Sequence, residues 1–310
     1  MLKRIKTYLL YNQNIKFLKV GLNAALNRLY PVIIKIWPLP KIKTIDETIE
    51  EIKTNKRSIV RFGDGEVIYL VNKIDLVFQE YDKELAETLE FLLKNQVPGL
   101  LVGLIDGYRD TNQFTPEVKK YTRSQTAFNY PRFAKFLNLD TTYWNANITR
   151  LYFGFKDQSQ CGRQFDMMRS LWEDRDILLI EGEKSRLGVG NDLFANAASV
   201  KRILGPPHHA YRRFDDMVAT ALQHAEENTI ALVAMGTTAK AVVYELFKNG
   251  IQAIDIGNID LEYQWYKMGA KERVLLAGRY VSEVKGGRVV ADVDDEDYHE
   301  QIVAKYLIEE

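Results

Sequence analysis

Short apolar runs alternate with helical patterns along most of the chain. Five runs have the composition of buried strands, at residues 58–62, 100–105, 176–181, 230–235 and 253–256. Between them, apolar side chains recur every three or four residues, beginning near Thr44 and again over 82–94, 164–172, 214–225 and 239–249. Continuous apolar strands that alternate with helices predict an α/β fold, with a mostly parallel sheet covered by helices on both faces.

The two ends of the chain differ from this pattern. Residues 1–45 mix basic and apolar side chains, with Pro38 and Pro40 near the end, and predict a basic amphipathic segment. Residues 280–293 predict a hairpin with Gly286-Gly287 at its turn, followed by a helix over 295–307. We therefore expect a main domain over 46–275 and a small C-terminal appendage over 276–310. Residues 106–150 are less regular and can form an insertion over a site.

Composition limits the class of protein. A chain of 310 residues with 46% hydrophobic and 27% charged residues is typical of an ordinary globular protein. The single cysteine, Cys161, excludes an internal disulfide and fits a reducing compartment. No apolar run reaches the ~20 residues of a membrane span, and the start lacks the apolar core of a signal peptide. These features predict a cytoplasmic protein.

The zero net charge hides an asymmetry. Residues 1–45 carry nine Lys or Arg and no acid, whereas the rest carries 33 Lys or Arg against 42 Asp or Glu. Basic side chains among aliphatic and aromatic ones favour contact with an anionic membrane surface, here the inner face of the membrane. The alternative is a helix packed on the protein's own body with a solvated basic face. Nucleic acid is a weaker candidate, because the basic bias stops at residue 45.

The most informative short motif is Gly63-Asp64-Gly65-Glu66, directly after the first predicted strand. Two carboxylates one residue apart at a strand end suit Mg²⁺ or Mn²⁺ shared with a phosphate, and the glycines let a ligand approach the backbone. The alternative is an ordinary turn with two solvated acids. A lone D-x-E matches by chance often, so its neighbours decide its meaning.

Polar and glycine-rich motifs follow three more of the predicted strands. Gly236-Thr237-Thr238 enters a helix and predicts a pyrophosphate site on free backbone amides, or an ordinary cap by either threonine. Arg186, with Gly188 and Gly190 beside it, can neutralise a phosphate while the glycines admit its bulk. Because ligands bind at the carboxyl ends of parallel strands, several such motifs on one edge predict a site there.

The remaining polar residues near the carboxyl ends of the predicted strands each have two interpretations. Asn191-Asp192 can contact a ligand, but the pair more often caps the following segment at 193–198. Asp255, Asp260 and Glu262 stand near the last strand as candidates for metal ligation or for a general base, and Asp255 can be a buried, hydrogen-bonded acid. No G-x-S-x-G or Walker A spacing occurs, which argues against triad hydrolases and P-loop enzymes.

Together these phrases resemble the bacterial glycosyltransferases of the GT-D fold, first known as a domain of unknown function. The similarity runs in order from about residue 45 to 275, and its matching phrases are residues 60–66, 181–194, 197–203, 235–239 and 253–265. The resemblance implies a Rossmann-like domain that binds a UDP-sugar, such as UDP-glucose, with Mn²⁺ or Mg²⁺ at the D-x-E pair. Carried over residue by residue, it implies metal ligands Asp64, Glu66 and Asn258, and nucleotide-sugar contacts by Arg61, Gly63, Arg186, Gly188, Gly190, Asn191, Asp192, Gly236, Thr237 and Thr238.

Two positions depart from the family pattern, which usually has His where this chain has Asn258 and Glu where it has Gln264. Asn258 still offers an oxygen, but neither amide is a strong base. Glu262 and Asp260 are the nearest carboxylates and become the candidates for the base that deprotonates an acceptor hydroxyl.

The expected activity is an inverting, metal-dependent transfer of a hexose from a UDP-sugar. The acceptor classes are a lipid-linked oligosaccharide of capsule or exopolysaccharide assembly and a glycoprotein. One alternative is a metal-dependent nucleotide phosphohydrolase or phosphotransferase. The other is a non-catalytic nucleotide-sugar-binding partner, which Asn258 and Gln264 make plausible.

Overall fold

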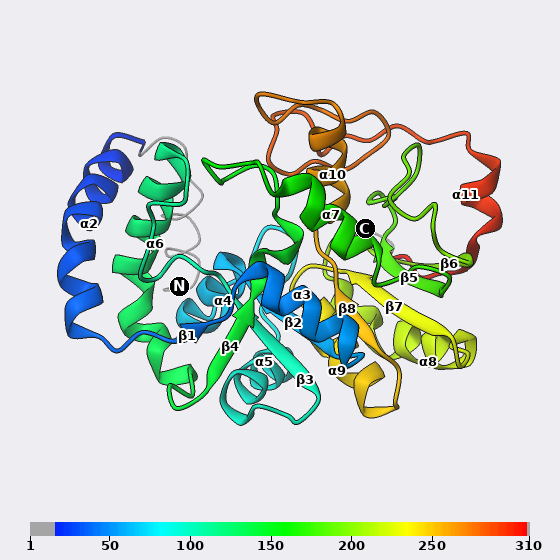
Figure 1. Cartoon of the computed structure of the whole chain (residues 1–310), viewed down its shortest axis with the longest axis horizontal. Coiled ribbons are helices and arrows are strands. Elements are labelled where there is room, and N and C mark those ends of the chain that lie inside the picture. The colour runs from blue at the N-terminus through cyan, green and yellow to red at the C-terminus, as the bar shows by residue number, and fades with distance from the viewer. Residues whose placement is uncertain (1–15, 309–310) are drawn as a thin grey trace.

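The computed structural model describes residues 16–308, in which nine strands join into one sheet (Figure 1). Every neighbouring pair runs parallel, in the order β1-β4-β3-β2-β8-β7-β5-β6-β9. The strands are β1 (Lys41–Ile42), β2 (Ser58–Phe62), β3 (Leu100–Leu104), β4 (Thr142–Asn145), β5 (Asp176–Gly182), β6 (Ser199–Gly205), β7 (Thr229–Ala234), β8 (Ala253–Asp255) and β9 (Ile302–Lys305). All five predicted strands are confirmed, within about one residue at each end.

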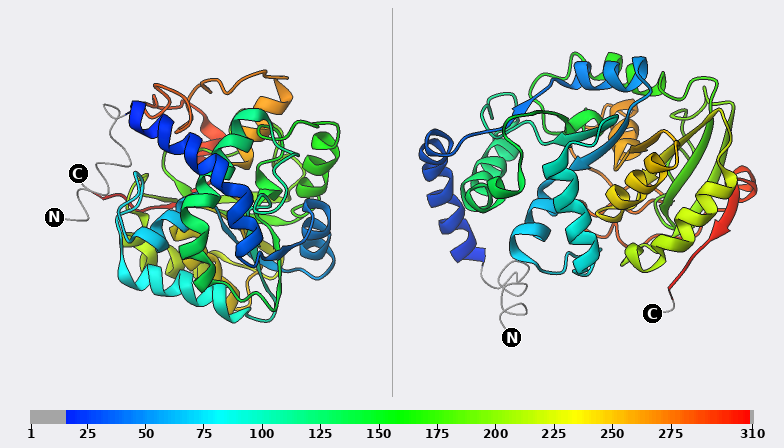
Figure 2. Two further views of the ribbon diagram at one scale, coloured as in Figure 1. Left: turned by 90° about the vertical axis from the view of Figure 1, so that its left-hand side faces the viewer. Right: turned by 90° about the horizontal axis from the view of Figure 1, so that it is seen from below.

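Helices cover both faces of the sheet, as the view from below shows most clearly (Figure 2). They are α2 (Lys16–Ile36), α3 (Ile45–Thr54), α4 (Asp64–Asn72), α5 (Lys83–Asn95), α6 (Pro116–Phe133), α7 (Cys161–Arg169), α8 (Phe214–His224), α9 (Thr238–Lys248), α10 (Ile259–Lys267) and α11 (Glu296–Glu300). The predicted α/β fold is therefore confirmed. The helix expected over 164–172 begins three residues earlier, at Cys161.

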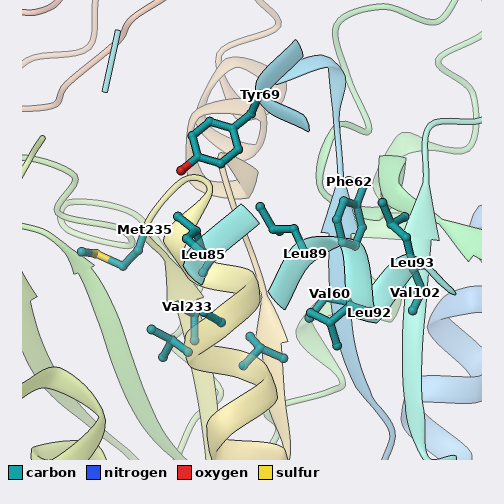
Figure 3. Close-up of a cluster of buried hydrophobic side chains, with 14 of the residues drawn as sticks. Val60, Phe62, Tyr69, Leu85, Leu89, Leu92, Leu93, Val102, Val233 and Met235 are labelled. Atoms are coloured by element: carbon teal, nitrogen blue, oxygen red, sulfur yellow. The ribbon is translucent and has the colours of Figure 1, made fainter. Parts of the chain in front are cut away.

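Alternate strand residues point to opposite faces and so build two separate cores. On one face, Val60 and Phe62 of β2 pack with the leucines of α5 (Figure 3). On the other, Ile59 of the same strand belongs to a cluster with helices α3, α7 and α10. Both faces are apolar along the central strands, which explains why these strands read as continuous hydrophobic runs rather than as alternating ones.

The strand order reverses beside β2. The chain passes from β2 to β3 and β4 on one side, whereas β5 to β9 all lie on the other side, so that β2 and β8 become neighbours. In an open parallel sheet such a switch point leaves a crevice outside the carboxyl ends of the strands. The fold thus creates a place for a ligand next to the D-x-E sequence that follows β2.

Two regions differ from the expectation. Residues 106–150, expected as an irregular insertion, hold the long helix α6 and the strand β4. Their mixed polar and aromatic residues give no clear helical stripe, because α6 buries polar residues such as Ser124 and Asn129 together with Tyr130. Residues 193–198, expected as a segment capped by Asn191-Asp192, form turns. These turns lead into β6, a strand that the hydrophobic pattern did not predict.

The predicted hairpin at 280–293 is wrong. These residues form successive turns, in which Val284 N donates to Val281 O and Gly287 N to Val284 O, so no ladder develops. Val281 is fully buried in the core, which curls the segment inward. The expected helix over 295–307 is also shorter: α11 ends at Glu300, and β9 then pairs with β6 at the edge of the main sheet.

The N-terminal helix α2 lies beside α6 at one end of the sheet (Figures 1 and 2). The hydroxyl of the buried Tyr30 donates to Tyr108 O at 3.0 Å, and Asn27 Nδ2 donates to Lys120 O at 2.9 Å. The part of the predicted basic segment over residues 1–15 lies outside the described residues. Among the helices of residues 16–308, none combines the length and the apolar character that crossing a bilayer requires.

Candidate active site

A cleft of about 530 Å³ opens at the carboxyl ends of four adjacent strands, β2, β8, β7 and β5. The loop after each of these strands contributes to its wall, together with the loops after β3, β4 and β6, residues 77–78 and the C-terminal segment. The residues that matter for its chemistry are Arg61, Gly63, Asp64, Glu66, Arg150, Lys184, Gly236, Lys240, Asp255, Asn258, Asp260, Tyr280, Ser282 and Arg288. The expected gathering of polar motifs at this edge is therefore present.

The two acids of the D-x-E sequence have different environments. Gly63 caps helix α4, whose first residue is Asp64, and the Glu66 carboxylate turns back to accept a hydrogen bond from Gly63 N at 2.8 Å. The other Glu66 oxygen lies 2.9 Å from Lys240 Nζ, and the side chain is only 8% exposed. Asp64 is exposed and accepts a hydrogen bond from the Tyr121 hydroxyl. Only Asp64 of the two offers an accessible carboxylate.

Beneath the cleft, Glu66 belongs to a buried network of four charges. Lys240 Nζ also lies 3.1 Å from an Asp255 oxygen, and Arg61 Nη2 lies 3.0 Å from the other Asp255 oxygen. Burial by itself raises the pKa of Asp255, but the charges of Arg61 and Lys240 outweigh it and hold that pKa below its ordinary value. Burial opposes the charge of Lys240, yet Asp255 and Glu66 raise its pKa. The network thus pairs two acidic with two basic side chains.

Asp260 lies in the first turn of helix α10 and lines the cleft, although it is almost fully buried. One of its oxygens accepts hydrogen bonds from Gly188 N at 2.9 Å and Asn191 Nδ2 at 2.8 Å, and the other lies 2.8 Å from Arg279 Nη1. Burial raises the pKa of this carboxyl, and the charge of Arg279 opposes that shift. A raised pKa favours proton acceptance near neutral pH.

Glu262 does not line the cleft. One of its oxygens accepts hydrogen bonds from the backbone amides of Tyr152 and Phe153, at 2.9 and 2.8 Å, and the other lies 3.5 Å from Arg150. Burial raises the pKa of this carboxyl, and Arg150 opposes the shift. A fully buried carboxylate that holds two backbone amides stabilises the fold, and its position argues against the expected role as the base.

Arg186, expected to bind phosphate, does not line the cleft, although Lys184, Ser185 and Leu187 of the same loop do. The Arg186 guanidinium donates to the carbonyls of Gly278 and Ala291, at 2.9 and 2.7 Å, and holds the C-terminal segment instead of lining the cleft. Gly188 lies against the Phe194 ring, where a Cβ atom would come within 2.4 Å of a ring carbon. Gly190 also lies outside the cleft wall. The glycines of this loop serve packing and turn geometry.

The neighbouring pair Asn191-Asp192 is also occupied within the protein. Asn191 Oδ1 accepts a hydrogen bond from Leu193 N at 2.9 Å, while Asp192 accepts one from the Tyr263 hydroxyl at 3.0 Å and pairs with Lys267. Neither residue lines the cleft. The capping interpretation of Asn191 is therefore correct, but the segment it caps is a turn.

Of the Gly236-Thr237-Thr238 turn, only Gly236 faces the cleft. Gly236 has φ +53, and a Cβ atom there would lie 2.7 Å from the Phe78 ring, so both the backbone and the space require glycine. Both threonines are fully buried: Thr237 Oγ1 donates to Glu66 and Thr238 Oγ1 to Gln79. The expected side-chain cap of α9 is wrong, because these hydroxyls bond to side chains rather than to the helix backbone.

Sequence reasoning missed four basic residues of the cleft: Arg150, Lys184, Lys240 and Arg288. Lys184 comes two residues after the last strand residue of β5, so its place at the active edge was open to prediction. Arg150 and Arg288 carry no such signal, because they come from a loop after β4 and from the supposed appendage. The C-terminal segment is therefore part of the cleft wall.

The residues present fit a divalent cation only in part. Within residues 16–308, no three or more His, Cys, Asp or Glu side chains gather in a metal-binding cluster. Glu66 is held by Lys240, whose charge repels a second cation there. Asp64 remains accessible, and Mg²⁺ in phosphate sites commonly takes one or two carboxylates and completes its shell with phosphate oxygens and water. Asp64 thus fits as a ligand, with the Asn258 amide oxygen in the same cleft.

An open parallel sheet with a polar cleft at its switch point is the arrangement of α/β proteins that bind nucleotides. Comparison with known proteins narrows this class. A family model described as "Glycosyltransferase GT-D fold" matches residues 59–284, and this chain belongs to that family of glycosyltransferases. The resemblance of the motifs is therefore confirmed.

Two curated relatives are streptococcal. Glycosyltransferase GlyD of Streptococcus pneumoniae serotype 4 is 37% identical over 268 residues, which are 86% of this chain and 33% of GlyD. The probable glycosyl transferase Gly of Streptococcus gordonii is 32% identical over 266 residues, which are 85% of this chain and 38% of Gly. The chain thus spans about a third of the length of these relatives.

Solved structures share the fold over most of this chain. The domain of unknown function 1792, described as having a distinct glycosyltransferase fold, superposes with a TM-score of 0.81 at 33% identity and covers 91% of this chain and 99% of its own. A glycosyltransferase of Streptococcus sanguinis gives a TM-score of 0.81 at 30% identity, covering 86% of this chain and 100% of its own.

Proposed function

We propose that this chain transfers a hexose from a UDP-sugar to a glycan acceptor, with inversion at the anomeric carbon. The observation that carries the proposal is the cleft of about 530 Å³ at the switch point of the sheet, in a member of a glycosyltransferase family. Its volume suits a small-molecule substrate, and its wall combines an accessible carboxylate with several cations.

The chemistry follows from what each part of the cleft offers. The acceptor hydroxyl attacks the anomeric carbon as the bond from that carbon to the donor's diphosphate breaks, and the diphosphate leaves with the electron pair. Asp260 is the candidate for taking the hydroxyl proton, because it lines the cleft and its carboxyl has a raised pKa. Mn²⁺ or Mg²⁺ held by Asp64 and Asn258 would stabilise negative charge on the diphosphate.

The proposed class of acceptor is inferred from the basic N-terminal residues 1–45 and from helix α2. We propose that the acceptor is presented at a membrane surface, as a lipid-linked oligosaccharide of capsule or exopolysaccharide assembly, with a glycoprotein as the other class. The nine basic residues and no acids among residues 1–45 favour an anionic surface. Four apolar side chains of α2 that are about half exposed or more supply the contact: Leu22, Leu29, Val32 and Ile36.

An assay of products tests the reaction type. The protein is incubated with UDP-sugars and Mn²⁺, with and without glycan acceptors, and UDP, free sugar phosphate and inorganic phosphate are measured. Transfer predicts UDP release that depends on an acceptor. Sugar phosphate or inorganic phosphate released without an acceptor would instead identify a phosphohydrolase. Binding without any turnover over a broad acceptor panel would identify a non-catalytic partner.

The same assay tests the base. Asp260→Asn is expected to lower kcat by roughly 10²–10⁴-fold, the usual contribution of a general base, with little change in the donor KM. Glu262→Gln is the matched control, two residues away on the same helix but outside the cleft wall, and the folded variant is expected to keep kcat. If kcat falls equally in the two variants, Asp260 is not the general base.

A further inference from the structure

The cations of the cleft fall into two groups. Three are already neutralised by carboxylates: Arg61 by Asp255, Lys240 by Glu66 and Asp255, and Arg150 by Glu283 at 2.7 Å. Lys184 and Arg288 also line the cleft, but neither pairs with any carboxylate of residues 16–308. Within that part of the chain, these two positive charges of the cleft have no carboxylate partner.

Backbone hydrogen bonds bring these two residues together. Tyr280 N donates to Lys184 O at 3.0 Å, and Val281 N donates to Gly287 O at 2.8 Å, so Lys184 and Arg288 flank one short stretch of chain. The backbone at Gly287 lies so close to Val281 that a Cβ atom on Gly287 would come within 2.3 Å of Val281 O. This close backbone contact constrains the position of the next residue, Arg288. Two like charges on neighbouring segments repel each other, and an anion between them removes that repulsion.

We propose that Lys184 and Arg288 bind the diphosphate of the nucleotide-sugar donor. An arginine can bind two phosphate oxygens at once, and a lysine supplies a mobile point charge, so together they match a diphosphate. The inference rests on the proposed function, since that function names the donor. It also assigns the role expected of Arg186 to two residues that do face the cleft.

The positions of the pair and of Asp64 are compatible with one shared ligand. Asp64 follows β2 and Lys184 follows β5, which lie three strands apart, or roughly 14 Å at the strand ends. Lys184, Arg288 and Asp64 all line the same cleft. A diphosphate bound between the pair and Asp64 would contact Lys184 and Arg288 on one side and the metal site at Asp64 on the other.

Calorimetric titration without divalent cations tests the pair directly, because Asp64 then contributes no metal. The probes are inorganic pyrophosphate and UDP, and the proteins are the wild type, Lys184→Met, Arg288→Met and the control Lys285→Met. Lys285 is exposed, lies in the same segment as Arg288 and does not line the cleft. Each cleft variant is expected to lose at least about tenfold in affinity for both probes, as for a charge-assisted hydrogen bond. The control should bind as the wild type does.

Thermal unfolding checks that each variant is folded, and we expect wild-type melting temperatures, since neither side chain takes part in an ion pair within residues 16–308. Equal binding of both probes by wild type and cleft variants would overturn the proposal, as would a wild type that binds neither probe. A rise in the acceptor KM with an unchanged affinity for UDP would also overturn it, because the phosphate would then belong to the acceptor. If pyrophosphate binding depends on the pair but no UDP-sugar is transferred, the inference stands and the proposed function fails.

Discussion

Glu66 and Lys240 illustrate what decides the role of a single residue in this protein. Sequence spacing placed Glu66 beside Asp64 as a second metal ligand, but helix α4 begins at Asp64 and turns Glu66 inward, where Lys240 of α9 meets it. Lys240 is 174 positions away in the chain, so no local pattern could predict the pairing. The structure replaces half of the proposed metal site with a buried ion network that supports the floor of the cleft.

Removing Lys240 tests that network. Lys240→Met leaves Glu66 and Asp255 buried without their common cation, and we expect the free energy of unfolding to fall by about 3–5 kcal/mol. Lys248→Met is the control on the same helix, where Lys248 and Glu245 form an exposed pair. That variant should lose no more than about 0.5 kcal/mol. Urea unfolding measures both, and equal losses would show that the buried network does not stabilise the fold.

At the scale of elements, the central strands and their helices were predictable, and the edges of the molecule were not. The runs of β2, β3, β5, β7 and β8 are buried on both faces, so their apolar character survives in the sequence. β6 begins with three partly exposed or exposed residues, and β4 has only four residues, so neither forms a clear apolar run. Gly286-Gly287 matched a hairpin turn locally, but burial of Val281 decided the path of the chain.

Helix α2 leads to a separate prediction, because it packs on α6 and also exposes apolar side chains, such as Leu29 and Ile36, together with Arg28 and Lys35. We expect the protein to sediment with vesicles that contain anionic lipid, to bind neutral vesicles less, and to be released by salt. Leu29→Glu with Ile36→Glu should lower this binding at least tenfold, since each leucine-sized side chain contributes about 1.5–3 kcal/mol when buried. Leu222→Glu changes an exposed leucine of α8, outside this helix, and serves as control.

Two results would contradict the membrane assignment. One is a protein that binds anionic and neutral vesicles equally weakly. The other is a concentration-dependent dimer that Leu29→Glu with Ile36→Glu abolishes, because a second copy of the chain would then cover the apolar face of α2.

At the scale of the whole molecule, the sheet explains how distant segments form one cleft. The strand order makes β2, β8, β7 and β5 neighbours, so loops near residues 64, 258, 236 and 184 meet at one edge. The location of this edge was predictable from the polar motifs that follow the strands. Which side chains face the cleft was not, because Arg186 is taken by the carbonyls of the C-terminal segment while Arg288 of that segment enters the wall.

The most direct test of the central claim is thermal unfolding of the wild type and Asp64→Ala with a panel of nucleotide sugars, with and without Mn²⁺. Binding of a nucleotide sugar in the cleft predicts that one UDP-sugar raises the melting temperature of the wild type in the presence of Mn²⁺. At a concentration 100 times Kd the stabilisation is about 2.7 kcal/mol. The shift should be smaller without Mn²⁺ and in Asp64→Ala, where Lys184 and Arg288 alone hold the diphosphate. If no nucleotide sugar stabilises the protein, or if Asp64→Ala responds as the wild type does, the assignment of this cleft is contradicted.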